Sequence, residues 1–241
     1  MHDPNMALRI ALIGYGLAGS TFHAPVIASV DGLQVTAVVT ANPLRSSRAQ
    51  ADLPDARVLS HPDQVWAARD EFDSVVVATP NESHVAVARA AIQAGLPTVV
   101  DKPLAVAAAD AADIVALARR RGVLLSVYQN RRWDAELLTL RRVLDDGSLG
   151  RVHRFESRFE RWRPQPKQGW RESGDPAAGG GVLLDLGSHL VDQAMHLFGS
   201  VTTVYGEVAV RRPAAVVDDD MFIAMRHTSG VTSHLWASAV A

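Results

Sequence analysis

The chain has 241 residues, of which 48% are hydrophobic and 21% are charged, as is typical of a globular protein and not of a disordered, collagen-like or disulfide-rich one. The formal net charge of -2 leaves no excess of positive charge for nucleic-acid phosphates. The absence of cysteine excludes disulfides, thiolate metal sites and thiol catalysis. No apolar run is long enough to span a membrane, and the first residues lack a signal-peptide pattern. We therefore expect a cytoplasmic protein with neither a nucleic-acid nor a membrane partner.

Short apolar runs alternate with helical segments in the first half of the chain. The runs are 8–13, 34–39, 72–78, 97–100 and 123–128, and helices are expected at 18–30, 82–94 and 107–121. The runs are continuously apolar, which indicates strands of a parallel sheet that is covered on both faces. We therefore predict a doubly wound α/β domain over residues 1–127.

The pattern changes after residue 127. Helices are expected at 133–145 and 182–197, and strands at 152–159, 201–210, 221–226 and 231–238. The last three strands have no helix between them, so we expect them to form an open, mainly antiparallel sheet with helices on one side. The sequence thus predicts an α+β domain over residues 128–241.

A glycine motif follows the first predicted strand and opens the first helix. Gly14 permits a tight turn, Gly16 lets backbone amides approach a pyrophosphate, and Gly19 allows close helix packing. The helix N-terminus adds amide donors and a partial positive charge. In this position the motif predicts a dinucleotide site, although a glycine-rich turn without a ligand is the alternative. The expected contacts are Gly14, Tyr15, Gly16, Leu17, Ala18 and Gly19.

The end of the second strand indicates which dinucleotide is bound. An Asp or Glu would accept hydrogen bonds from the ribose hydroxyls of NAD, but the stretch from Val39 to Arg48 has no acid. Thr40, Asn42 and Arg45 suit an added 2′-phosphate, because a guanidinium can bind a phosphate through two hydrogen bonds. We predict NADP, with NAD possible; the alternative for Arg45 is a solvated position at a helix start.

Two more loops follow strands of the predicted parallel sheet, where such sheets bind ligands. In the first, Thr79, Pro80, Asn81 and His84 are expected cofactor contacts, and Asn81 or Ser83 can instead cap the next helix.

The second loop is Asp101-Lys102-Pro103. Lys102 can donate a hydrogen bond and positive charge to a substrate oxygen, and Pro103 restricts the residue before it to an extended conformation. A surface lysine in a turn is the alternative.

The helix expected at 182–197 carries three polar residues at helical spacing. Asp185, His189 and Asp192 are four and three residues apart, so they share one face of a regular helix. The spacing fits either a buried structural Asp–His pair or a catalytic one. We expect no metal site, because Asp and His at this spacing lack a clear third ligand.

Together the motifs resemble the glucose-fructose oxidoreductase / inositol dehydrogenase / rhizopine catabolism (Gfo/Idh/MocA) family. The resemblance rests on Gly-x-Gly-x-x-Gly, on an acid-Lys-Pro loop and on Gly179-Gly180-Gly181 followed by Asp185 and His189. The segments from Gly14 to Pro25 and from Tyr128 to Asp134 look most like the branch of NADP-dependent scyllo-inositol dehydrogenases. The family usually has Glu where this chain has Asp101, which we take as a tolerated variant.

The resemblance implies an NADP(H)-dependent oxidoreductase that transfers hydride to or from a cyclitol or sugar carbon. Lys102 would orient the substrate hydroxyl, His189 would be the general acid/base, and Asp185 would hold both side chains in place. Arg161 and Arg163 would meet substrate hydroxyls. Further cofactor contacts would come from Asp101, Lys102, Pro103, Asn130, Trp170 and Arg171.

Two other functions remain open at this stage. The first is an aldose or dihydrodiol dehydrogenase of the same family. The second is a sensor or regulator that binds NADP without turnover. The resemblance also implies a homo-oligomer, dimer or tetramer, and a second domain that is incomplete at its C-terminal side, with an unpaired apolar edge at 231–238.

Overall fold

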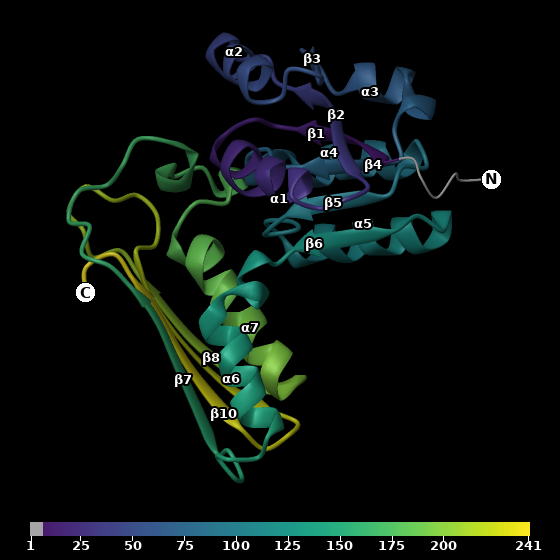
Figure 1. Cartoon of the computed structure of the whole chain (residues 1–241). Helices are drawn as coiled ribbons and strands as arrows, with labels where there is room; N and C mark the ends of the chain where they lie inside the picture. The colour runs from purple at the N-terminus through teal and green to yellow at the C-terminus, as the bar shows by residue number, and fades with distance from the viewer. Residues whose placement is uncertain (1–6) are drawn as a thin grey trace. The chain divides into compact units, whose positions relative to one another are not determined.

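The computed structural model describes residues 7–241 and forms two compact units. The first unit ends at Tyr128, and the second is Gln129–Ala241. Each unit has its own sheet (Figure 1). Each also has its own apolar core. No helix in the described part of the chain is both long and apolar enough to cross a membrane.

The sheet of the first unit has six strands, and every neighbouring pair is parallel. Its spatial order is β3-β2-β1-β4-β5-β6. The strands are β1 (Leu8–Ile13), β2 (Leu33–Val39), β3 (Arg57–Leu59), β4 (Ser74–Val77), β5 (Thr98–Asp101) and β6 (Leu125–Tyr128). The direction of winding reverses between β1 and β4, which is the position where doubly wound sheets bind their ligands. The predicted parallel α/β sheet is confirmed.

Both faces of this sheet are covered by helices. Ala11 and Ile13 of β1 belong to the core cluster that includes residues of α4 and α5, whereas Ile10 and Leu12 belong to the cluster of α1 and α2. Burial on alternate sides explains why the strand is continuously apolar. The helical elements are η1 (Ala18–His23), α1 (Ala24–Ala28), α2 (Pro43–Asp52), α3 (Asp63–Ala67), η2 (Arg69–Glu71), η3 (Asn81–Ser83), α4 (His84–Gln93) and α5 (Ala108–Arg121).

The segment between β2 and β4 differs most from the sequence prediction. It contains α2, β3 and α3, for which the sequence analysis gives no predicted bounds. Strand β3 has three residues and α3 has five, so neither is long enough to show a hydrophobic period.

The second unit has a mixed four-stranded sheet in the order β7-β10-β9-β8. Strand β9 is antiparallel to β8 and β10, whereas β7 is parallel to β10. The strands are β7 (Arg154–Glu160), β8 (Val201–Ala209), β9 (Asp220–His227) and β10 (Thr232–Ser238). The helical elements are η4 (Asn130–Trp133), α6 (Ala135–Asp145), η5 (Trp170–Glu172), η6 (Pro176–Ala178), η7 (Leu183–Gly187) and α7 (Ser188–Phe198). Leu190 and Ala194 of α7 pack on Met221, Met225 and Leu235 of the sheet.

The expectation of an unpaired edge at 231–238 is wrong. Strand β10 lies inside the sheet, with β7 on one side and β9 on the other, and the edges are β7 and β8. The prediction assumed that strands adjacent in sequence are adjacent in space, but β7 pairs with the last strand of the chain.

Candidate active site

Two of the three glycines in the turn after β1 are required by the fold itself. Gly14 has a φ of +101°, and a Cβ there would lie 2.4 Å from the carbonyl oxygen of Ala78. A Cβ on Gly19 would lie 2.1 Å from the carbonyl oxygen of Gly14. Gly16 differs, because a Cβ there would meet only the Arg45 side chain, 3.9 Å from its Cζ. The open space at Gly16 fits a pyrophosphate close to the backbone.

The Tyr15 side chain is turned into the core and does not face a ligand. It is 2% exposed, and its hydroxyl donates a hydrogen bond of 3.0 Å to Asp52. Burial and the Asp52 carboxylate raise the pKa of Tyr15 to about 12. Tyr15 therefore offers only its backbone to a cofactor, while Leu17 in the same turn is exposed.

The predicted phosphate ligands Thr40, Asn42 and Arg45 lie at the start of α2, and Arg45 reaches the glycine turn. Asn42 caps α2, since its Oδ1 accepts a hydrogen bond of 3.0 Å from the backbone N–H of Arg45. This cap places the Arg45 side chain against Gly16. Within residues 7–241, no carboxylate lies within 4.0 Å of the Arg45 guanidinium. Arg45 is therefore a cation beside the glycine turn without an ion-pair partner there.

Side-chain hydrogen bonds to backbone carbonyl oxygens hold the loop after β4. The Ser83 hydroxyl lies 2.8 Å from the carbonyl oxygen of Pro80 and does not cap α4, so the alternative that Ser83 is a cap is wrong. His84 is 1% exposed, and its Nδ1 and Nε2 lie 2.8 Å and 2.9 Å from the carbonyl oxygens of Pro103 and Thr79. Both nitrogens of His84 therefore tie the Thr79 loop to the Lys102 loop, and its contact with the cofactor stays a prediction.

Buried rings support the loop that carries Lys102. The backbone N–H of Lys102 donates a hydrogen bond of 2.8 Å to Asp101 Oδ1. His23 Nε2 lies 3.9 Å from Asp101 Oδ2, and the His23 ring lies 4.2 Å from that of Tyr128. Burial lowers the pKa of His23, although the Asp101 charge opposes this. Sequence reasoning gave no role to His23 or Tyr128, although both lie in the segments that carry the family resemblance.

The segment with Asp185 and His189 is not one regular helix. Asp185 lies in the π-helical turn η7, and His189 lies in the first turn of α7. Arg132 donates two hydrogen bonds to Asp192, from Nε to Oδ2 at 2.8 Å and from Nη2 to Oδ1 at 2.6 Å. His189 and Asp192 lie three residues apart in α7 and share a face of it, as expected. Asp185 lies in the wider π turn, so its spacing to His189 differs from that of a regular helix.

The last glycine of Gly179-Gly180-Gly181 lets the Asp218 carboxylate lie close to the backbone before η7. Gly181 has a φ of +90°, and a Cβ there would overlap the Asp218 carboxylate. Asp218 Oδ2 accepts a hydrogen bond of 2.7 Å from the N–H of Leu183, and the N–H of Gly181 donates to the carbonyl of Arg171. Burial raises the pKa of Asp218, although the backbone N–H groups of Leu183 and Val182 oppose this. Sequence reasoning missed Asp218, whose only signal is the run of three Asp at 218–220.

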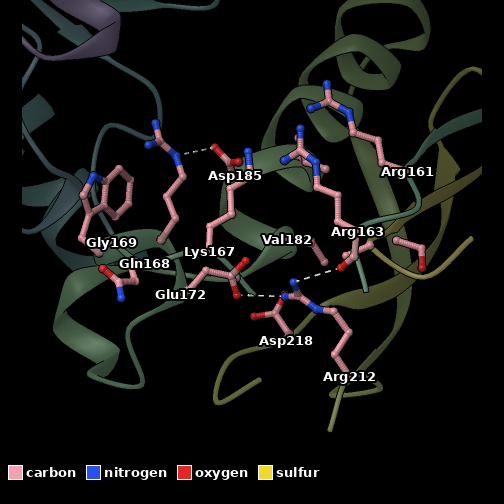
Figure 2. Close-up of a pocket in the computed structure, with 16 residues that line it drawn as sticks. Arg161, Arg163, Lys167, Gln168, Gly169, Glu172, Val182, Asp185, Arg212 and Asp218 are labelled. Atoms are coloured by element: carbon pink, nitrogen blue, oxygen red, sulfur yellow. Dashed lines mark hydrogen bonds and ion pairs between the residues drawn. The ribbon is translucent and has the colours of Figure 1, made fainter. Parts of the chain in front are cut away.

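A cavity of about 200 Å³ lies within the second unit, and Asp185 lines it together with several cations (Figure 2). Asp185 Oδ1 accepts a hydrogen bond of 3.3 Å from Arg171 Nε, and the Arg171 guanidinium lies 4.3 Å from the Trp170 ring centre. His189 is 7% exposed and lines a different cavity, of about 330 Å³, beside Arg131 and Phe159. Asn130 begins η4 and is half-buried.

Arg212 also lines the cavity that Asp185 lines, and it binds two carboxylates. It is 4% exposed and lies between Asp219 and Glu172, with distances of 2.8 Å to each carboxylate. Burial opposes the charge on Asp219, but the backbone donors of Arg211 and Arg212 and the Arg212 guanidinium outweigh burial and lower the pKa of Asp219. Sequence reasoning missed this cluster, which joins residues 172, 212 and 219.

The predicted cofactor-binding and catalytic residues come from both units. The first unit holds the glycine turn, Arg45 and Lys102, and the second holds Asp185, His189, Arg161 and Arg163. A lysine and a histidine of this kind can donate positive charge and exchange protons with a hydroxyl group. Among residues 7–241, no group of three or more His, Cys, Asp or Glu side chains is arranged to hold a metal ion.

Two family models match the chain, one on each side of Gln129. The oxidoreductase family model with an NAD-binding Rossmann fold covers residues 8–129, and the GFO/IDH/MocA C-terminal domain covers residues 137–241. The chain belongs to the GFO/IDH/MocA oxidoreductase family. The resemblance found in the sequence is thereby confirmed.

Several curated proteins align with most of this chain. The uncharacterized oxidoreductase YdgJ of Escherichia coli is 42% identical over 88% of this chain and 60% of its own length. The scyllo-inositol 2-dehydrogenase (NADP(+)) IolW of Bacillus subtilis is 35% identical over 88% of the chain and 58% of its own length. The D-apiose dehydrogenase of Paraburkholderia graminis is 32% identical over 92% of the chain and 58% of its own length. The chain thus spans about three fifths of these relatives.

Solved structures agree with this assignment. The YvaA protein of Bacillus subtilis superimposes with a TM-score of 0.89 at 31% identity, over 98% of this chain and 65% of its own. An oxidoreductase of Yersinia pestis has a TM-score of 0.88 at 38% identity, over 98% and 65%.

Proposed function

We propose that the chain acts as an NADP(H)-dependent dehydrogenase that transfers hydride between nicotinamide and a hydroxyl or ketone carbon of a cyclitol or sugar. The observation that carries the proposal is the glycine turn after β1, with the Arg45 guanidinium beside Gly16 and no acid at the end of β2. Among the relatives, IolW is named as an NADP(+) enzyme that acts on scyllo-inositol.

The residues around the turn fit a dinucleotide. The space that a Cβ on Gly14 or Gly19 would fill is occupied by backbone, whereas the space at Gly16 is open. A guanidinium can bind a 2′-phosphate through two parallel hydrogen bonds, which supports NADP over NAD. The proposed contacts on this side are the backbone of residues 14–19 with the side chains of Thr40 and Arg45, joined by Thr79, Pro80 and Asn81.

The proposed chemistry uses one residue from the first unit and two from the second. His189 takes the proton of the substrate hydroxyl on oxidation and returns it on reduction. Lys102 stabilises the developing negative charge on the same oxygen. Asp185 holds these side chains in position. A bound nicotinamide supplies the hydride acceptor, and Asp101, Pro103, Asn130, Trp170 and Arg171 are the further residues proposed to hold it.

Two alternatives are kept because specific observations favour them. The D-apiose dehydrogenase relative supports an aldose as substrate, and a dihydrodiol dehydrogenase belongs to the same reaction type. A sensor that binds NADP without turnover is consistent with the glycine turn and Arg45, since these residues bind and do not react.

The decisive experiment measures NADPH formation with a panel of inositols and aldoses. We expect turnover with at least one of them, and a fall of about a hundredfold or more in Lys102→Ala and in His189→Ala, the range usual for proton-transfer groups. His153→Ala, at an exposed position, is the control and should keep wild-type turnover. Tight NADPH binding with no turnover across the panel would support the sensor instead.

Cofactor choice is tested separately by titration. Arg45→Gln should weaken NADPH binding at least about tenfold and leave NADH binding unchanged, because only NADPH carries the 2′-phosphate. Arg48→Gln is the matched control, since Arg48 lies on the same helix and pairs with Asp52 at 3.3 Å. A tenfold preference of the wild-type chain for NADH would contradict the NADP assignment.

A further inference from the structure

Arg161 and Arg163 present their side chains on the same side of one extended segment. The N–H of Arg161 donates a hydrogen bond of 2.9 Å to the carbonyl of Ser238, and that of Arg163 donates one of 2.7 Å to Ala239. Residues two apart in an extended chain point to the same face, and Trp162 between them is 70% exposed. The backbone thus fixes the side of the cavity on which both guanidinium groups lie.

The cavity holds more positive charge than its own acids neutralise. Of its acids, Asp185 is bound by Arg171, Glu172 is bound by Arg212, and Asp218 receives the N–H of Leu183. No carboxylate in the described part of the chain lies within 4.0 Å of the charged ends of Arg161, Arg163 or Lys167. In Figure 2 the charged ends of these three residues point the same way.

Arg161 feels the positive charge of neighbouring arginines. Arg161 is 4.7 Å from the Phe159 ring centre, and Arg131 lies at the same distance from this ring. Partial burial, followed by the charges of Arg163 and Arg131, lowers the pKa of Arg161, although the charge of Asp185 opposes this. An anion placed between Arg161 and Arg163 would relieve this repulsion, and each guanidinium can bind a carboxylate or a phosphate through two hydrogen bonds.

We propose that Arg161, Arg163 and Lys167 form an anion subsite in the cavity that Asp185 lines, so that the substrate is a polyhydroxylated compound carrying a carboxylate or a phosphate ester. This inference rests on the proposed dehydrogenase function, because it names the substrate class of that site. The cavity volume of about 200 Å³ is below the roughly 300–1,000 Å³ typical of drug-sized ligands. The volume therefore suits a single small sugar acid or sugar phosphate.

The test compares the binding of matched neutral and anionic compounds by calorimetry, with the whole chain at saturating NADPH. D-glucuronate against D-glucose tests the carboxylate, and D-glucose 6-phosphate against D-glucose tests the phosphate. We expect at least one of the two anions to bind about tenfold or more tightly than glucose, and this preference to shrink as salt is raised. Equal binding of all three compounds would overturn the proposal.

Variants assign the preference to these residues. Arg161→Gln combined with Arg163→Gln should remove the anion preference, whereas Arg151→Gln, at an exposed position outside the cavity, should retain it. A preference that survives in the double variant would overturn the subsite. NADPH formation is measured in parallel, so that a failure of the proposed subsite can be distinguished from a failure of the proposed dehydrogenase function. Selective binding of anions without NADPH formation would support the anion subsite and contradict the dehydrogenase. Turnover of neutral polyols with no preference for anions would support the dehydrogenase and contradict the subsite.

Discussion

At the scale of single residues, the glycine turn separates a folding role from a binding role. Gly16→Ala should leave the free energy of unfolding within about 0.5 kcal/mol of wild type, because the added methyl group meets only the end of Arg45 at 3.9 Å. The same methyl group occupies the space proposed for the pyrophosphate, so NADPH affinity should fall about tenfold or more. Urea unfolding and fluorescence titration with NADPH measure the two effects.

Gly19→Ala provides the comparison within the same turn. Its methyl group would lie 2.1 Å from the backbone oxygen of Gly14, so we expect a loss of about 1–3 kcal/mol of stability together with weaker binding. If Gly16→Ala bound NADPH as tightly as wild type, the pyrophosphate would have to lie elsewhere.

His23 makes stability depend on pH. Burial lowers its pKa from the ordinary value of 6.5, so between the two values the unfolded chain binds more protons than the folded one. The contribution of His23 is complete above about pH 6.5 and is lost as the pH falls below it, by at most about 1.4 kcal/mol per pH unit. We expect urea unfolding at pH 5.5 and 7.5 to show this loss.

A variant that cannot be protonated isolates this effect. His23→Phe keeps a ring against Tyr128 and should reduce the difference in stability between pH 5.5 and 7.5, and His23→Gln should do the same. His153→Gln, at an exposed position, should keep the wild-type difference. The same pH dependence in all three variants would assign it to other groups.

At the scale of elements, the buried charge cluster at the start of β9 should contribute strongly to stability. Asp219→Ala leaves the buried Arg212 with Glu172 alone, and breaking one side of a buried pair costs about 3–5 kcal/mol. Asp220→Ala is the neighbouring control, because its partner Arg211 is exposed and such pairs are worth about 0–1 kcal/mol. Urea unfolding measures both, and equal losses would contradict the prediction.

If Asp219→Ala does not fold, a double variant keeps the prediction testable. Arg212→Met combined with Asp219→Leu removes both buried charges and should recover much of the stability. If this double variant is no more stable than Asp219→Ala, the loss of stability comes from side-chain packing and not from an unpaired buried charge.

Elements with a strong local signal could be predicted from the sequence, and those without one could not. The strands of both sheets except β3, and the helices at 84–93 and 108–121, follow from local hydrophobic patterns and their lengths. Strand β3 and helix α3 were too short to show a period, and the π turns η1 and η7 have no distinct pattern. The central position of β10 depends on pairing with β7, about 80 residues earlier in the chain, which local patterns do not report.

The candidate site shows the same division. Residues that lie in a local motif, such as Gly14, Lys102 and Asp185, could be named from the sequence. Arg212 could not, because its partners are 7 and 40 residues away and only the fold brings them together. The burial of His84 between two loops could not be predicted either, because its partners at Thr79 and Pro103 come from different segments.

At the scale of the whole molecule, α7 covers one face of the second sheet, and no helix among residues 7–241 covers the other (Figure 1). Met221 and Met225 of β9 face α7, whereas Phe222 belongs to the opposite face. On that face Tyr205, Phe222 and Trp236 form a row of rings across β8, β9 and β10, with neighbouring ring centres 6.4 Å and 5.2 Å apart. A row of rings across an uncovered sheet is typical of a surface that associates with another protein.

The family resemblance predicts a homo-oligomer, and this row of rings is where we expect the contact. Tyr205→Lys combined with Phe222→Lys should place repelling charges across the contact and shift the chain toward monomer in sedimentation experiments. Val30→Lys, at an exposed apolar position in the first unit, is the control and should leave the sedimentation coefficient unchanged. A wild-type chain that sediments as a monomer at tens of micromolar would contradict the prediction, because an apolar contact of this kind should form at that concentration.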